Sequence, residues 1–147
     1  MPVLRRGITG FDVDRKVDFA AFKEAVHAAA RSAGASLIRT VPGDGVTPNF
    51  HQADVQLGGR ELSILCNRAF PIVAVVECPI VNGEMQPVDL PNLTDPMAEN
   101  GYEVVFAAEL ARAIAPDDLQ ALSDSERDQA KYWKPKCIGQ VVFNWWD

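Results

Sequence analysis

Apolar residues recur with the period of a helix in the first quarter of the chain. Between Asp18 and Gly34 they fall on one stripe, while Glu24 and Arg31 lie away from it. The stripe consists of Phe19, Phe22, Val26, Ala29, Ala30 and Ala33. Asp18 is suited to the N-cap and Gly34 to the C-terminal stop. The pattern therefore predicts a helix from Asp18 to Ala33 with one face packed on a core.

The pattern after this helix predicts strands. Ala35 to Val41 has the composition of a strand, and the Pro- and Gly-rich residues 42–48 break it into a loop. Ile72 to Glu77 is apolar on both faces until its last residue, as in a central strand covered on both sides. Leu4 to Val13 is either a first strand or an extended lead-in.

The clearest structural signal is a hairpin. Phe50–Leu57 and Arg60–Asn67 are alternating runs separated by Gly58-Gly59, and glycine supplies the positive backbone angles that a two-residue turn requires. This turn places His51 opposite Cys66, on the face that we expect to line the core.

The middle of the chain is rich in proline. Four prolines interleaved with Asn and Asp predict a long irregular segment from Pro79 to Asn100, of the kind that is often functional or mobile. Tyr102 to Phe106 is predicted to return as a strand, and Ala107 to Ile114 to form a short helix.

Two further helix signals follow. Pro116-Asp117-Asp118 places a proline and two acids in a helix first turn, and Ser123 with Glu126 has the spacing of a capping box. The second of these helices is expected to end before Pro135. The last segment, Ile138 to Trp146, is a strand or a helix, and the helix separates its polar and apolar residues better.

These elements predict a single α+β domain over residues 1–147. We expect an antiparallel sheet of about four to six strands, with the long N-terminal helix on one face and short C-terminal helices completing the core. The chain length and the 48% of hydrophobic residues suit one continuous core.

Charge is concentrated in one part of the chain. The segment from Glu77 to Asp128 carries twelve acidic residues and two basic ones, Arg112 and Arg127, and the net charge of the chain is −6. A one-sided acidic field attracts basic partners and repels nucleic acid and anionic membranes. We therefore expect a basic protein as partner, and neither nucleic acid nor a membrane.

The leading hypothesis is a non-enzymatic protein-binding domain. A small acidic domain without catalytic residues is similar in charge and size to bacterial immunity proteins, which neutralise basic toxins, and a regulatory role is the related possibility. The candidate partner-binding residues are Glu84, Asp89, Asp95, Glu99 and Glu103. Two alternatives to a partner-binding role remain for these residues. They form a solvated acidic surface, or they have a metal-binding or catalytic role, which would need convergent geometry that spacing in a loop does not indicate.

A second hypothesis is a small thiol-dependent enzyme that uses Cys66 and His51. The hairpin register places their β-carbons roughly 5 Å apart, and a neighbouring imidazole can lower the pKa of a thiol. The structural alternative is a buried thiol beside a core histidine. We expect no metal site here, because zinc needs three or four convergent ligands and Cys78 is predicted on the opposite face.

The last fifteen residues contain three tryptophans and a phenylalanine. They predict a docked tail, since an unstructured tail would leave these side chains in water. The main alternative is an exposed aromatic patch, and a small-ligand-binding domain with an aromatic-lined pocket is the third functional hypothesis.

The ending also carries a resemblance. Tyr132-Trp133, Pro135, Gly139 and Phe143-Asn144, with Trp146-Asp147, resemble the close of a group of small, uncharacterised bacterial proteins. The resemblance covers little more than the last sixteen residues. It implies a bacterial protein with its natural C-terminus and carries over no functional residue.

Other signatures are absent from the sequence. There is no glycine-rich phosphate loop, G-x-S-x-G elbow or H-E-x-x-H helix, so no cofactor is expected. Cys66, Cys78 and Cys137 are too few for a disulfide framework and should be reduced. Arg5 and Arg6 are not followed by an apolar run, which argues against a signal peptide or membrane anchor. We therefore expect a cytoplasmic protein.

Overall fold

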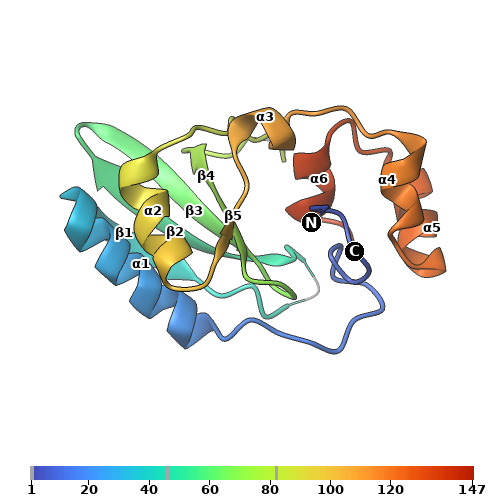
Figure 1. Cartoon of the computed structure of the whole chain (residues 1–147), viewed down its shortest axis with the longest axis horizontal. Coiled ribbons are helices and arrows are strands. Elements are labelled where there is room, and N and C mark those ends of the chain that lie inside the picture. Colours follow the sequence, from blue (N-terminus) through green and yellow to red (C-terminus); the bar gives the residue numbers. More distant parts are fainter. Residues whose placement is uncertain (1, 46, 82) are drawn as a thin grey trace.

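A five-stranded sheet forms the centre of the computed structural model (Figure 1). The strands follow one another in the order β1-β2-β3-β4-β5, with β1 to β4 antiparallel and β5 parallel to β4. The strands are β1 (Ser36–Val41), β2 (Phe50–Leu57), β3 (Arg60–Asn67), β4 (Ile72–Glu77) and β5 (Glu103–Val104). The predicted α+β class is confirmed, and the parallel β5 makes the sheet mixed at one edge.

The structure describes residues 2–45, 47–81 and 83–147. The positions outside these ranges are Met1, Val46 and Asn82. They belong to the chain start, to the predicted loop 42–48 and to the predicted irregular segment. The described helices are α1 (Phe19–Ala33), α2 (Pro91–Glu99), α3 (Ala107–Leu110), α4 (Pro116–Gln120), α5 (Asp124–Trp133) and α6 (Ile138–Val142).

Local sequence signals set several of these boundaries. The side chain of Asp18 accepts a hydrogen bond from the Ala20 N–H at the start of α1, and Gly34 ends this helix in the left-handed conformation. Ser123 and Glu126 form the predicted capping box of α5. The β2–β3 hairpin turns at Gly58-Gly59, both with positive φ, and pairs His51 with Cys66 as predicted.

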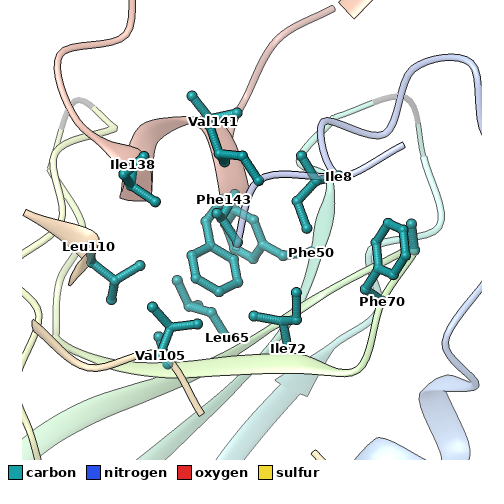
Figure 2. Close-up of a cluster of buried hydrophobic side chains, with 14 of the residues drawn as sticks. Ile8, Phe50, Leu65, Phe70, Ile72, Val105, Leu110, Ile138, Val141 and Phe143 are labelled. Carbon is teal, nitrogen blue, oxygen red and sulfur yellow. The ribbon is translucent and has the colours of Figure 1, made fainter. Parts of the chain in front are cut away.

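Two apolar cores lie on the two faces of the sheet. On one face, α1 and α2 lie side by side and bury Phe22, Val26, Leu93 and Met97 against the strands. On the other face, the N-terminal segment and the C-terminal helices pack around Phe50 (Figure 2). In that second core Figure 2 shows side chains from distant parts of the sequence, including Ile8, Leu110, Val141 and Phe143.

Three asparagines join the two ends of the chain to the sheet. Asn49 and Asn67 each donate to the backbone carbonyls of Ile8 and Val142, at 2.8 to 3.1 Å. Asn144 donates to the carbonyl of Thr9 at 3.1 Å and receives the N–H of Trp146. All three side chains are buried. The segment that precedes α1 is therefore fixed against the C-terminal tail.

The predicted irregular segment from Pro79 to Asn100 is wrong in its second half, which forms α2. Pro91 occupies the first turn, where a missing N–H costs no helix hydrogen bond. The helix continues past Pro96 because Leu93 and Met97 bury themselves completely beside α1. Tertiary burial thus outweighs the cost of the internal proline.

Two other expectations are settled at the chain ends. The segment from Leu4 to Val13 is an irregular lead-in and contains no strand. The C-terminal segment is helical only as far as Val142, and Phe143 to Asp147 continue without regular structure. In the described residues, no helix is long and apolar enough to cross a membrane.

Candidate functional site

His51 and Cys66 are neighbours, but the thiol lies inside the protein. Cys66 is completely buried, and its Sγ donates to the backbone carbonyl of Asn67 at 3.4 Å. Burial raises the pKa of the Cys66 thiol far above its usual value, because the thiolate would lose its hydration. A reactive cysteine needs an accessible thiolate, so this geometry gives the thiol-enzyme hypothesis no support.

Both ring nitrogens of His51 are used to hold backbone. The Gly43 N–H donates to Nδ1 at 2.8 Å, so Nε2 carries the proton and donates to the Val17 carbonyl at 3.0 Å. Burial lowers the pKa of His51, and the charge of Arg68 acts in the same direction. His51 is therefore a neutral structural clamp between the lead-in to α1 and the β1–β2 loop.

Cys78 lies near a polar cluster on the other face of the sheet. Its Sγ is 2.7 Å from Oγ of Ser63 and 3.7 Å from Oδ1 of Asp54. The pKa of Cys78 is raised, because burial and the carboxylates of Asp54 and Glu61 disfavour the thiolate. As predicted, Cys78 does not converge with His51 and Cys66.

Asp54 is the buried carboxylate of this cluster. Burial opposes its ionisation, but hydrogen bonds from Gln52, Ser63 and Arg39 outweigh that effect and lower its pKa. All of these contacts satisfy the carboxylate within the fold, so the cluster has the character of a structural network. Across the described ranges, no group of three or more His, Cys, Asp or Glu side chains could hold a metal ion.

Three of the five candidate acidic residues lie in local settings of their own. Glu103 is paired with Arg5 at 3.1 Å. Asp89 accepts the Ala107 N–H at 2.7 Å at the start of α3. Glu84 is exposed in the loop that precedes α2. The other two, Asp95 and Glu99, line one groove.

Asp95 and Glu99 are exposed on α2 and line a groove beside α1 with a volume of about 440 Å³. We call it the α1–α2 groove. Besides two prolines, it is lined by Ala28, Ser32, Asn92, Asp95, Glu99 and Asn100. Every charged side chain in this lining is acidic. Neither carboxylate forms an ion pair among residues 2–45, 47–81 and 83–147.

A larger hollow, of about 930 Å³, lies beside His51. We call it the His51 hollow. It is lined by residues 13–19 and 42–45, with Gly10, His51 and Arg68. Its lining combines three basic side chains, three acidic ones and the apolar side chains of Val13, Val17, Phe19 and Pro42. No pattern in the sequence predicts this site, because Arg15 and Arg68 are far apart in the chain and neither belongs to a motif.

The aromatic C-terminus is docked, as predicted, and it also borders a small hollow. Phe143 is 1% exposed and Trp146 is 6% exposed, whereas Tyr132 is 74% and Trp133 is 37% exposed. Trp133, Trp145 and Trp146 line the hollow, whose volume is about 230 Å³. The terminus therefore includes both predicted features, a core anchor and an exposed aromatic surface.

Comparisons of the chain with protein-family models, with curated proteins and with solved structures found no match.

Proposed function

We propose that the protein is a non-enzymatic binding domain that holds a basic segment of another protein in the α1–α2 groove. The observation that supports this proposal is the charge of the groove, where Asp95 and Glu99 are the charged lining residues. The partner would be neutralised or regulated by this contact, in the manner of immunity-type or regulatory proteins.

The spacing of the two acids suits a basic side chain. Asp95 and Glu99 are four residues apart on α2, so their β-carbons are about 5–6 Å from each other on one face of the helix. Ala28 and Ser32 on the α1 side are small and neutral. An arginine or lysine of a partner therefore meets two carboxylates and no positive charge among the residues that line the groove.

Charge complementarity alone would contribute more to the selectivity for a basic partner and to the association rate than to the affinity of the complex. An exposed ion pair contributes about 0.2–1 kcal/mol, so two such pairs do not make a stable complex by themselves. Long-range attraction by a chain of net charge −6 accelerates association with a basic protein. The proposed complex should consequently be sensitive to salt in its association rate.

The test is affinity capture from a lysate of the source organism at low and at raised salt, with mass spectrometry of the retained proteins. We expect one stoichiometric basic protein that is released at raised salt. Retention of no protein at low salt, or of a partner whose binding does not respond to salt, would argue against the proposal.

Thiol chemistry and aromatic-pocket binding are the competing functions. The first requires rapid alkylation of Cys66 in the native protein, which its burial opposes. The second requires a metabolite that quenches the fluorescence of the tryptophans beside the 230 Å³ hollow.

A further inference from the structure

The His51 hollow has a lining of balanced charge. Arg15, Lys16 and Arg68 face it as basic residues, and Asp14, Asp18 and Asp44 as acidic ones. A ligand that carries one sign of charge would meet as many repelling groups as attracting ones. A ligand that carries both signs, held close together, would find a partner for each.

The two arginines are held in place before any ligand binds. Nη1 of Arg68 donates to the carbonyls of Gly43, at 3.4 Å, and Gly45. Nε of Arg15 donates to the Ala69 carbonyl at 3.1 Å, and its guanidinium lies 4.3 Å from the centre of the Phe70 ring. A guanidinium fixed in this way loses little conformational entropy when its remaining N–H groups bind a carboxylate.

Two of the three acids can receive a cation. Asp18 is used in part as the N-cap of α1, where it accepts the Ala20 N–H at 3.3 Å. Asp14 and Asp44 are exposed. Within the residues that the structure describes, neither forms an ion pair. Both residues line the hollow, Asp14 from the lead-in to α1 and Asp44 from the β1–β2 loop.

The rest of the lining is uncharged. His51 is neutral because its Nδ1 accepts the Gly43 N–H, and its ring lies 5.3 Å from that of Phe19. Val13, Val17, Phe19 and Pro42 supply apolar surface. The volume, about 930 Å³, is within the range of about 300–1,000 Å³ that is typical of small-molecule sites.

We infer that the His51 hollow binds a small zwitterion of amino-acid type with an apolar side chain. The guanidinium groups of Arg15 and Arg68 hold the carboxylate, the carboxylates of Asp14 and Asp44 hold the ammonium group, and the apolar lining residues contact the side chain. A free amino acid and a short peptide share this chemistry. The site has no lining residue in common with the α1–α2 groove, so its test is independent of the proposed function.

The test is an NMR titration of the ¹⁵N-labelled protein with four probes. L-phenylalanine and the dipeptide Phe-Phe carry both charges, 3-phenylpropionate lacks the ammonium group, and phenethylamine lacks the carboxylate. We expect saturable shifts in the amides of residues 10–19 and 42–45 with a zwitterion. Each truncated probe should bind at least about tenfold more weakly, since each loses one set of charged contacts. The tighter of the two zwitterions then distinguishes amino acid from peptide.

Matched variants connect the binding to the hollow. Arg15→Gln should weaken binding of the zwitterion about tenfold or more, whereas Arg31→Gln, on the exposed last turn of α1, removes the same charge elsewhere and should have no effect. Equal affinity for all four probes would overturn the inference, because it would indicate an apolar surface only. Absence of saturable shifts at millimolar probe, or equal effects of the two variants, would overturn it as well.

Discussion

Glu126 is predicted to be the most sensitive buried polar residue of the fold. Its carboxylate is fully buried and accepts four hydrogen bonds. Oε1 accepts the N–H groups of Gly7, at 2.8 Å, and Ser123, at 3.0 Å. Oε2 accepts the N–H of Thr9, at 3.0 Å, and the Thr9 hydroxyl. One side chain therefore both caps α5 and holds the N-terminal segment in place.

The cost of removing these bonds can be worked out from their number. A buried donor left without a partner costs about 1–3 kcal/mol, although water can reach some of the four in a truncated variant. Glu126→Ala should therefore lower the free energy of unfolding by roughly 3–5 kcal/mol. Glu126→Gln keeps the shape but turns one acceptor oxygen into an NH₂ group that faces two donors. Its expected cost is roughly 2–4 kcal/mol.

The assay is urea unfolding at neutral pH, followed by circular dichroism, for the wild type, both Glu126 variants and Glu24→Gln. Glu24 lies on the exposed side of α1, so its variant controls for the loss of one negative charge and should differ by less than about 0.5 kcal/mol. If Glu126→Gln unfolds at the same urea concentration as Glu24→Gln, the four hydrogen bonds do not stabilise the fold as argued.

Three further predictions concern His51, Cys66 and the C-terminal tail. Burial lowers the pKa of His51 below its usual 6.5, so below that pH the unfolded chain takes up a proton that the native chain does not. The free energy of unfolding should therefore fall as the pH drops below about 6.5, and the fall should be smaller in His51→Gln. Urea titrations at several pH values measure this difference. Cys66 should resist alkylation until the protein is denatured, whereas the partly exposed Cys78 and Cys137 should react before it. Peptide mass spectrometry after a timed iodoacetamide pulse gives the order, and labelling of Cys66 before the other two would contradict this prediction. Deletion of residues 143–147 removes the buried Phe143 and Trp146 and should abolish cooperative unfolding, whereas a retained sigmoidal melting curve would contradict the docked tail.

Much of the fold could be predicted because its signals are local. Asp18 and Gly34 mark the ends of α1, and Gly58-Gly59 sets the register that pairs His51 with Cys66. The capping box of Ser123 and Glu126 was equally readable from the sequence. The second role of Glu126 has no local signal, because its carboxylate accepts hydrogen bonds from backbone N–H groups more than a hundred residues away.

The candidate sites depended on contacts that the sequence does not encode locally. The prolines predicted an irregular segment where α2 forms, since the burial of Leu93 and Met97 beside α1 is a tertiary effect. The same helix brings Asp95 and Glu99 to one groove, while Glu103 is paired with Arg5 near the other end of the chain. The number of acidic residues predicts an acidic protein. It does not indicate that Asp95 and Glu99 line one groove.

The most direct test of the proposed function is the affinity of the captured basic partner for two matched double variants, measured at low salt. Asp95→Asn/Glu99→Gln neutralises the α1–α2 groove, and Asp117→Asn/Asp128→Asn removes the same charge from exposed positions on α4 and α5. The proposal predicts that the groove variant loses affinity by up to about thirtyfold, the limit for two exposed ion pairs, and that the control variant stays within about twofold of the wild type. Equal losses in the two variants would show that net charge, and not the groove between α1 and α2, attracts the partner.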